Sequence, residues 1–595
     1  MIATTQTLPL RLVLLREIPE NDNLRREWND LVLRVQHPQV FYTYEWALSV
    51  HRAYKETLTP LLFLGYEGGQ LSGVAPLAVG AGGSEVSFLC ATTGDYCDFI
   101  ASQEHIGSFI SLVLAELKTL GFARTSLANL PADSLSVATL RETSSSIGFR
   151  LFARTAYDCA QVSFKNSPGQ DRKPVIRRER TIRRYLNAMS REAPLRLEHE
   201  RSWNAIAAAL PGFIEAHVAR FLATGRISNL ASRQRRVFLE ELAKRLSECG
   251  WLNLTRMVKG ATTIAWNYGF RFQGTWFWYQ PTFSMDMEKY SPGMCLLAKI
   301  LDEAADDPAI TTVDLGLGAE AYKQAFANQS RRTLYITLRT SPVQHAREIG
   351  RYYAASVIKA SPWAESKTRA ALAHWQSLAD RAHRAGLVPT LAWSAKRACD
   401  FLVANEEVHF FEGNEEATTN VTHTRLVPLD LKGLAAATAQ YADDASTCAY
   451  LLRAAQLARK SGIEGFALVD DTETFLHFAW ITAFDGFYLS ELNDRVQAPS
   501  PECVMIFDCW TPPAVRGQGH YGEAVALIAD LLRNRGKKPW IFSAATNTPS
   551  LRGLEKAGFQ RRYSLVRRRV LGWQKIKSRI LTATETVPEE VSTHS

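Results

Sequence analysis

The sequence predicts a mixed α/β (α+β) protein made of three mixed-sheet domains. Strand and helix patterns alternate in the same way three times along the chain, in residues 10–165, 170–340 and 405–575. The composition, with 46% hydrophobic and 22% charged residues among 595, excludes a disordered or fibrous chain. Residues 341–404 are rich in alanine and predict a helical connector, and the polar residues 580–595 predict a disordered tail.

The first block shows helical spacing of apolar residues in two places and strand-like apolar runs between them. Strands are predicted at residues 11–18, 58–67, 70–80, 84–91 and 122–131, and helices at 23–35 and 105–121. Gly68 and Gly69 favour a tight turn between the second and third strands, and Gly121 is the expected stop of the second helix.

The second block opens with a basic helix at residues 171–192, which carries eight Lys or Arg and three acidic residues. Helices are also predicted at 202–223 and 232–249, strands at 251–260, 262–270, 275–283 and 311–318, and a short helix at 319–328. Another helix is expected after Ser291-Pro292-Gly293, because proline is favoured at the first helical position. The run from Trp276 to Tyr279 predicts a core strand, with a sugar-stacking wall as the alternative.

The third block contains the most informative stretch. An apolar strand at residues 504–510 runs into a loop, a helix at 525–536, a strand at 539–546 and a helix that ends in K-A-G-F at 556–559. Two groups of arginines follow, Arg561 with Arg562 and then Arg567 to Arg569. They predict a strand that is partly an exposed sheet edge, where basic side chains protect against aggregation.

Charge and cysteine content narrow the function classes. The net charge of +9, from 69 Lys and Arg against 60 Asp and Glu, permits an anionic ligand such as CoA, a nucleotide or an acidic glycan without requiring a nucleic acid. The nine cysteines contain no C-x-x-C pair, so we expect reduced, mostly buried thiols, no metal site and a cytoplasmic protein. No run of 18 uninterrupted apolar residues occurs and the first residues do not resemble a signal peptide, so neither a membrane span nor secretion is expected.

A loop rich in glycine, R-G-Q-G at residues 516–519, joins the strand at 504–510 to the following helix. Gly517 and Gly519 allow a tight turn, and the N–H groups at the helix start then point outward, with the helix dipole adding positive potential. The sequence therefore predicts a cradle for a pyrophosphate. The pattern of a P-loop is absent, and the dinucleotide-binding pattern lacks its acidic residue after the next strand.

The third block resembles the GNAT acyltransferases. The resemblance rests on P-x-x-R-G-x-G at 513–519, Asn547 after a strand and E-K-A-G-F at 555–559. It implies that acetyl-CoA or another acyl-CoA is the co-substrate, with no metal. The residues expected to bind it are Trp510, Val515, Arg516, Gly517, Gln518, Gly519, His520, Tyr521 and Asn547.

Two positions depart from the GNAT pattern. Tyr521 stands where the family usually has Gly or Ala, a feature shared, together with I-F-D at 506–508, with a branch found near polysaccharide genes. Leu554 stands where many members have a tyrosine that protonates the CoA thiolate, so the general acid is missing, replaced or not needed.

Transfer of an acyl group also needs a base and a group that polarises the thioester. Asp508 and Glu491 are the candidate general bases, and each is equally interpretable as a structural or solvent-facing acid. The backbone near Trp510 is expected to polarise the thioester carbonyl. Because Asp508 alternates with Ile506 and Trp510, all three are predicted to share one strand face.

Residues 20–335 resemble the CelD-type acetyltransferases of cellulose and exopolysaccharide loci, which are tandem GNAT-like folds distantly similar to Fem-type aminoacyl transferases. The matching features are Trp28, Leu31, F-Y-T-Y-E-W (41–46), G-V-A-P-L (73–77), G-D-Y-C-D-F (94–99), the basic helix (177–186), Y-S-P-G (290–293) and D-L-G-L-G-A-E-A-Y-K (314–323). Asp95, Asp98, Tyr279 and Lys323 are candidate substrate-binding residues. The alternatives are a turn cap for the two aspartates, a core position for Tyr279 and a solvent-facing Lys323.

Two features of the second block have a functional and an ordinary interpretation. The start of the helix after Ser291 is either a second phosphate cradle or a simple helix start. The arginines from Arg177 to Arg184 are placed to hold the CoA 3′-phosphate or a tRNA backbone, and a solvated helix face is the commoner alternative.

Three functions remain open on this basis. The first is an acyltransferase that moves an acyl group from acyl-CoA to an amine or hydroxyl of a sugar, polysaccharide precursor or other small acceptor. The second is a Fem-like transferase that uses aminoacyl-tRNA, and the third is a catalytically inactive binding or scaffold protein. The expected partner is a small molecule or glycan, DNA is not expected, and tRNA enters only in the second reading.

Overall fold

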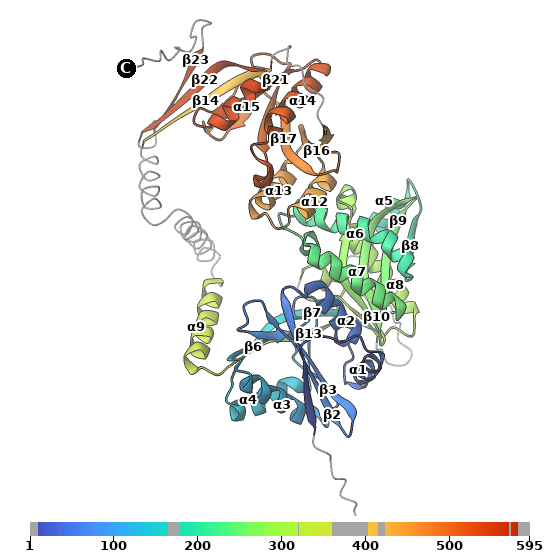
Figure 1. The fold of residues 1–595 in the computed structure, drawn as a ribbon. Coiled ribbons are helices and arrows are strands. Elements are labelled where there is room, and N and C mark those ends of the chain that lie inside the picture. Colours follow the sequence, from blue (N-terminus) through green and yellow to red (C-terminus); the bar gives the residue numbers. More distant parts are fainter. Residues whose placement is uncertain are drawn as a thin grey trace, which may run out of the picture. The chain divides into compact units, whose positions relative to one another are not determined.

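The computed structural model describes residues 10–164, 176, 179–318, 320–359, 403–413, 423–570 and 573–580. The chain divides into two compact units, unit 1 (Met1–Arg220 and Ser232–Val357) and unit 2 (Phe221–Ala231 and Ile358–Ser595). Both are built from helices packed on mixed sheets, so the predicted mixed α/β class is confirmed (Figure 1). The predicted tail beyond residue 580 and most of the predicted connector, residues 360–402, lie outside the described residues.

Unit 1 contains one sheet of thirteen strands among the residues described. In chain order these are β1 (Arg11–Leu15), β2 (Leu58–Glu67), β3 (Gln70–Gly80), β4 (Val86–Phe88), β5 (Ile100–Ala101), β6 (Arg124–Pro131), β7 (Arg150–Ser163), β8 (Leu195–Glu200), β9 (Leu252–Lys259), β10 (Thr262–Phe272), β11 (Thr275–Phe283), β12 (Thr312–Asp314) and β13 (Gln329–Arg339). Their spatial order is β1-β2-β3-β4-β6-β13-β7-β12-β11-β10-β9-β8, with β5 beside β3.

The first two predicted blocks share this sheet because β13 crosses between them. β13, late in the second block, pairs antiparallel with both β6 and β7 of the first block. β7 pairs on its other side with β12 of the second block. The hydrogen-bond ladder therefore runs without a break from one block to the next.

The N-terminal half of the chain contains nine helices and four 3-10 turns among its described residues. The helices are α1 (Asp22–Arg34), α2 (Tyr44–Tyr54), α3 (Ile106–Thr119), α4 (Leu135–Ile147), α5 (Glu179–Ser190), α6 (Trp203–Ala223), α7 (Arg233–Glu248), α8 (Pro292–Asp306) and α9 (Pro342–Lys359), and the 3-10 turns are η1 (Val40–Tyr42), η2 (Asn229–Ala231), η3 (Met285–Tyr290) and η4 (Lys323–Ala325). Of these, η2 and the last residues of α6 belong to unit 2. In the described part of the chain α6 alone has the length and apolar composition of a membrane-spanning helix, and 39% of its most apolar window is buried in the fold.

Local signals in this half are confirmed. Gly68 and Gly69 adopt positive φ angles of 57° and 89° in the turn between β2 and β3, and α3 ends just before Gly121, at φ 82°. The predicted short helix at 319–328 is wrong. Within residues 320–328 only the 3-10 turn η4 forms, because Lys323 turns back to bind the Leu317 carbonyl oxygen at 2.7 Å and β13 begins at Gln329.

Unit 2 contains a sheet of eight strands and a two-stranded hairpin among its described residues. The strands are β14 (Val403–Gly413), β15 (Thr424–Pro428), β16 (Ile463–Asp470), β17 (Phe475–Ala483), β18 (Phe487–Leu489), β19 (Asp494–Val496), β20 (Cys503–Trp510), β21 (Lys538–Ala544), β22 (Phe559–Val570) and β23 (Trp573–Ile580). The sheet order is β15-β16-β17-β20-β21-β14-β22-β23, and β18 pairs only with β19. The helices are α12 (Leu431–Gln440), α13 (Ala445–Leu457), α14 (His520–Asn534) and α15 (Thr548–Lys556), with the 3-10 turn η5 (Pro513–Val515).

The arginine-rich strand β22 is not an edge, so that prediction is wrong. β22 pairs with β14 on one side and with β23 on the other. β14 comes from a segment more than a hundred residues earlier in the chain. Its carboxylates meet the arginines of β22, as Glu406 does with Arg567 at 3.1 Å, and Arg567 is 8% exposed.

Helices α14 and α15 lie against one face of the unit 2 sheet (Figure 1). Val525 and Ile528 of α14 and Leu554 of α15 form a core with Ile506 of β20 and Ile541 of β21. The apolar 3.6-residue spacing of α14 produces this buried stripe. Packing on this face fixes α14 and α15 beside the ends of β20 and β21, where the site lies.

Candidate active site

Strands β20 and β21 separate part-way along their length. They pair in parallel from Cys503 opposite Lys538 to Ile506 opposite Ile541, and no further. Beyond that point β20 stays paired with β17, through Trp510 opposite Phe478, and β21 stays paired with β14. The parts of β20 and β21 beyond this last pair are called the lips, and the opening between them is called the slot. The backbone groups of the two lips do not hydrogen-bond to each other.

A β-bulge lies on the β20 side of the slot. Trp480 of β17 opposes Phe507, but Phe478 opposes Trp510, so β20 carries one extra residue in this interval, and Asp508 adopts φ 47°. The predicted common face of Ile506, Asp508 and Trp510 is wrong, because the bulge breaks the alternation. Ile506 packs in the core with α14, whereas the Trp510 ring stacks on Tyr450 of α13 at 5.3 Å.

The glycine-rich loop adopts the predicted form. Gly517 and Gly519 have φ angles of 81° and 93°, and a Cβ built at either position meets no atom within 4 Å. Helix α14 starts at His520, earlier than predicted, and no side chain caps it. Within the described chain the N–H groups of residues 517–522 donate no hydrogen bond. This open row of donors at a helix start suits an anion such as a pyrophosphate.

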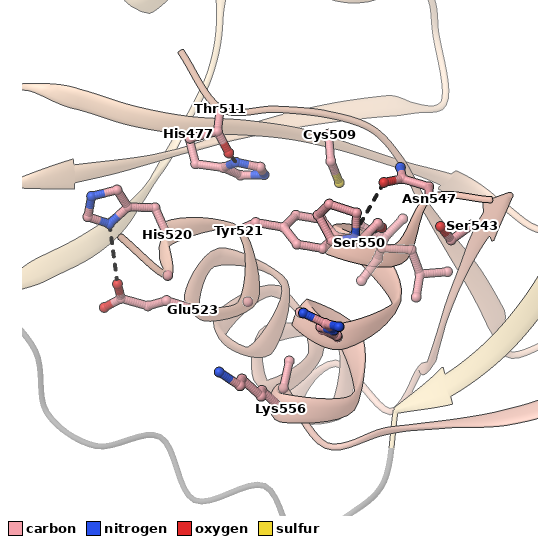
Figure 2. Close-up of a pocket in the computed structure, with 18 of the residues that line it drawn as sticks. His477, Cys509, Thr511, His520, Tyr521, Glu523, Ser543, Asn547, Ser550 and Lys556 are labelled. Atoms are coloured by element: carbon pink, nitrogen blue, oxygen red, sulfur yellow. Dashed lines mark hydrogen bonds and ion pairs between the residues drawn. The ribbon is translucent and has the colours of Figure 1, made fainter. Parts of the chain in front are cut away.

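Residues 517–522, with their open N–H groups, are called the cradle. One cavity of about 1200 Å³ joins the slot to the cradle. The structure brings together all eleven residues predicted for the C-terminal site: Glu491, Asp508, Trp510, Val515, Arg516, Gly517, Gln518, Gly519, His520, Tyr521 and Asn547. A cavity of this size accepts an extended ligand rather than a single small metabolite. Figure 2 shows the side of the cavity formed by α14 and α15.

The two candidate bases differ in environment. Asp508 is half-buried, and burial raises the pKa of its carboxyl group, against the opposing charge of Arg453. Its backbone carbonyl accepts a hydrogen bond from the Tyr450 hydroxyl at 3.1 Å. Glu491 is exposed in the turn between β18 and β19, and its carboxylate accepts a hydrogen bond from Ser490 at 2.9 Å. A raised pKa makes the Asp508 carboxylate a stronger base than an ordinary aspartate, and it lies in the bulge itself.

Arg516 and Asn547 hold the walls of the cavity. The Arg516 Nε donates to the Thr511 carbonyl oxygen at 2.9 Å, and its guanidinium lies 5.0 Å from the Trp510 ring centre. These contacts tie the cradle to the bulged strand. Asn547 caps α15 by accepting from the Ser550 N–H at 3.4 Å, so its role in the structure is to start that helix.

Tyr521, which stands where the GNAT pattern usually has Gly or Ala, packs between two helices. Its ring extends from α14 toward α15, and its hydroxyl lies 2.8 Å from Ser550 Oγ (Figure 2). Burial raises the pKa of Tyr521 far above the ordinary value, so the hydroxyl stays protonated at neutral pH. Leu554, the second departure, is fully buried in the core and contributes no polar group.

His477 and Cys509 are among the side chains of this cavity that sequence reasoning missed. His477 is 1% exposed; its Nδ1 lies 2.7 Å from Thr511 Oγ1, and its Nε2 has no hydrogen-bond partner within the described residues. Burial and the neighbouring His520 lower the pKa of His477 to about 3, so the ring is neutral. The available signal was an ionisable residue inside the otherwise apolar run F-L-H-F-A-W. For Cys509, whose pKa burial raises, no signal separated it from an ordinary core thiol.

Two of the residues predicted in the N-terminal blocks, Asp95 and Lys323, meet in a polar cluster of unit 1. Burial and the carboxylate of Asp314 raise the pKa of Asp95 to about 7, against the charge of Lys323. Asp314 accepts a hydrogen bond from the Tyr96 hydroxyl at 2.7 Å. Lys323 is 4% exposed, so the alternative that it faces water is wrong.

The other two, Asp98 and Tyr279, make contacts within the fold. Burial raises the pKa of Asp98 to about 6, and its carboxylate accepts from the Phe99 N–H at 2.8 Å. The Tyr279 hydroxyl accepts from Arg235 at 2.8 Å and donates to the Thr93 carbonyl oxygen. Asp98 lies outside the turns of the described structure, and Tyr279 lies in β11.

The remaining expectations concern the basic helix, the helix start at Ser291 and the cysteines. Arg183 and Arg184 of α5 are exposed, while Arg177 and Arg178 lie outside the described residues. Ser291 adopts φ 47° before Pro292, so the predicted start of α8 is confirmed. The eight cysteines in the described ranges are free thiols and six of them are buried, as predicted. In the same ranges no group of three or more His, Cys, Asp or Glu is arranged to hold a metal ion.

Comparison with known families concerns unit 1. Residues 177–324 match the family model described as an acetyltransferase (GNAT) domain. This segment is similar to GNAT acetyltransferases. The GNAT-like segment runs from the basic helix through α8 to η4 and includes Ser291, Asp314 and Lys323.

Solved structures resemble part of the chain at low identity. They include FemX (10% identity, 54% of this chain and 98% of that chain, TM-score 0.39) and a tandem GNAT protein from the clavulanic acid biosynthesis pathway (13%, 56% and 99%, TM-score 0.33). L-PGS from Bacillus licheniformis is a third (11%, 51% and 96%, TM-score 0.34). No curated protein matches the chain.

Proposed function

We propose that unit 2 is an acyltransferase that takes an acyl group from acyl-CoA and transfers it to an amine or hydroxyl. The observation that carries this proposal is the continuity of the slot between β20 and β21 with the cradle at residues 517–522. CoA presents a pyrophosphate, then an arm with two amide groups, then the thioester. The open N–H row suits the pyrophosphate, and the unpaired backbone of the two lips suits the amides of the arm.

The residues of the chain then have distinct roles. The N–H groups of the cradle bind the pyrophosphate, and Arg516 holds the cradle against Trp510. Backbone N–H groups at the bulge polarise the thioester carbonyl as negative charge develops on its oxygen. Asp508 removes the proton from the attacking amine or hydroxyl. The nitrogen or oxygen of the acceptor bonds to the thioester carbon and the C–S bond breaks. The CoA thiolate leaves and takes up one proton, which balances the proton that Asp508 removed.

The acceptor class follows from the sequence resemblance rather than from the cavity. The CelD-type motifs of residues 20–335 support a sugar or a polysaccharide precursor as acceptor. The GNAT-like segment at 177–324 supports an acyltransferase ancestry for unit 1 as well. We therefore infer that the chain combines two acyltransferase-like units, of which unit 2 carries the cradle with the arginine-glycine pattern.

A second candidate function is acyl-CoA binding without turnover. It is favoured by Leu554, which is fully buried at the position where many GNAT enzymes have a tyrosine acid. Under this second hypothesis the cavity binds acyl-CoA as a ligand, and no thiol is released.

The test is thiol release by the full-length protein from acetyl-CoA, with a panel of amino sugars, other sugars and small amines. Release that depends on one acceptor supports the transferase. Binding of acetyl-CoA without release for any acceptor supports the second candidate. Absence of both binding and release would overturn the proposal.

A further inference from the structure

Two phenylalanines mark the point where the slot opens. Ile506 and Ile541 form the last pair between β20 and β21, so Phe507 and Phe542 are the first residues of the two free lips. The two isoleucines pack in the core with α14. Since side chains alternate along a strand, the two phenylalanines lie on the opposite face, where they pack against the core cluster that includes Trp540 and Leu489. Both phenylalanines also line the cavity.

A third phenylalanine, from the β18–β19 hairpin, contacts both lips. The ring of Phe487 lies 5.3 Å from that of Phe507 and 5.8 Å from that of Phe542, in tilted or edge-on geometry. These separations are in the range of favourable aromatic contacts. Phe487 is not among the residues that line the cavity, but its ring supports Phe507 and Phe542, which do line it, at the closed end of the slot.

The hairpin that carries Phe487 is anchored to the fold. Phe484, at its base, is fully buried and stacks on Phe410 at 6.1 Å. The Gly486 N–H donates to the Val496 carbonyl oxygen at 3.0 Å, and Arg495 donates to the Gly486 carbonyl oxygen at 2.8 Å. The backbone on either side of Phe487 is therefore fixed by buried packing and by hydrogen bonds.

We propose that Phe487, together with Phe507 and Phe542, is the stop that limits the length of the acyl group, so that unit 2 takes acyl groups of two or three carbons. This inference rests on the proposed function. With its pyrophosphate at the cradle, the arm of acyl-CoA runs along the slot toward the closed end. There the acyl group meets the rings of Phe507 and Phe542, which Phe487 holds in place from behind. A short acyl group packs its methyl against an apolar wall, whereas a longer chain has to displace an anchored ring.

The experiment is a calorimetric titration of the full-length protein with acetyl-CoA and with octanoyl-CoA. The wild type is expected to bind acetyl-CoA about tenfold or more tightly than octanoyl-CoA. Phe487→Ala is expected to tighten octanoyl-CoA binding by about tenfold, because the vacated ring volume accepts methylene groups, and to change acetyl-CoA binding by less than about threefold. Phe487→Leu, which fills most of the space, is the matched control and should stay close to the wild type.

The outcomes separate this inference from the proposed function. Equal affinity of the wild type for both acyl-CoAs, or an unchanged affinity ratio in a folded Phe487→Ala protein, overturns the stop. Phe542→Ala repeats the test from the other lip if Phe487→Ala loses its circular dichroism spectrum, and an unchanged ratio in that variant also overturns the stop. A wild type that binds neither acyl-CoA overturns the proposed function itself.

Discussion

The ring of Tyr521 occupies the space that a side chain at residue 553 would need. A Cβ built at Gly553 comes 2.7 Å from Tyr521 Cδ1 and 3.0 Å from Cε1, distances at which the ring has to move. The same two helices approach closely at Gly522, where a Cβ would lie 3.2 Å from the Gly553 carbonyl oxygen. The missing side chain at Gly553 in α15 thus leaves the space that the ring of Tyr521 in α14 fills.

This relationship predicts a sign change in a double-mutant cycle. Gly553→Ala alone is expected to lower the free energy of unfolding of unit 2 by about 1–3 kcal/mol, because the new methyl group overpacks against the ring. In the Tyr521→Ala background the same substitution should raise it by up to about 1 kcal/mol, since alanine favours a helix over glycine. Denaturant unfolding of the four proteins measures the cycle. Equal effects of Gly553→Ala in both backgrounds would contradict the packing described.

The proposal that Asp508 is the general base is tested by removing the charge of its side chain. Asp508→Asn is expected to lower kcat by roughly 100-fold or more, the usual contribution of a positioned base. Because burial raises the pKa of Asp508, the wild-type rate should rise with pH through an apparent pKa above that of an ordinary aspartate, and the variant should lose this limb. Acceptor-dependent thiol release measured across pH provides both readouts.

Glu491→Gln is the matched control for that experiment. Glu491 lines the same cavity but is exposed, so its substitution should change kcat by only a few-fold. A large loss in Glu491→Gln together with a mild effect of Asp508→Asn would reverse the assignment of the base.

His477 predicts how the stability of unit 2 depends on pH. Its pKa is about 3 in the folded protein, against about 6.5 when unfolded, so the unfolded chain binds its proton first as the pH falls. The stability is complete above pH 6.5 and is lost between about pH 6.5 and 3. At pH 5 this residue should lower the free energy of unfolding by about 2 kcal/mol relative to pH 7.

Replacing His477 by Asn removes this titration and retains a partner for Thr511. The difference in unfolding free energy between wild type and His477→Asn should therefore narrow by about 2 kcal/mol from pH 7 to pH 5. Guanidinium unfolding followed by tryptophan fluorescence at the two pH values tests it. A difference that does not vary with pH would show that His477 titrates normally in the fold.

Features encoded locally were predictable from the sequence. The cradle depends on glycines that tolerate positive φ and on a helix start, and both lie within a few consecutive residues, at Gly517 to His520. The same holds for the turn at Gly68 and Gly69. The order of strand, helix, strand and helix within residues 504–559 followed from apolar periodicity, which needs no knowledge of distant partners.

Features that depend on distant pairing were not predictable in this way. The bulge at Asp508 is a shift in the pairing register between β20 and β17. A prediction from the alternation of residues within β20 alone could not include this shift, and it placed Trp510 on the wrong face of the strand. The interior position of β22 depends on β14, and the continuity of the unit 1 sheet depends on β13. His477 entered the site only once the packing of β17 beside Thr511 and Tyr521 was known.

The central claim is that the cradle at Gly519 binds the pyrophosphate of acyl-CoA. The most direct measurement is calorimetric titration of acetyl-CoA into the full-length wild type, Gly519→Glu and Gly462→Glu. Gly462 shares a positive φ and open space around its Cβ but lies outside the cavity, so it controls for backbone strain. We predict binding to the wild type and to Gly462→Glu, and at least a roughly 100-fold loss in Gly519→Glu from charge repulsion and lost space. Undiminished affinity of a folded Gly519→Glu protein for acetyl-CoA would contradict the account.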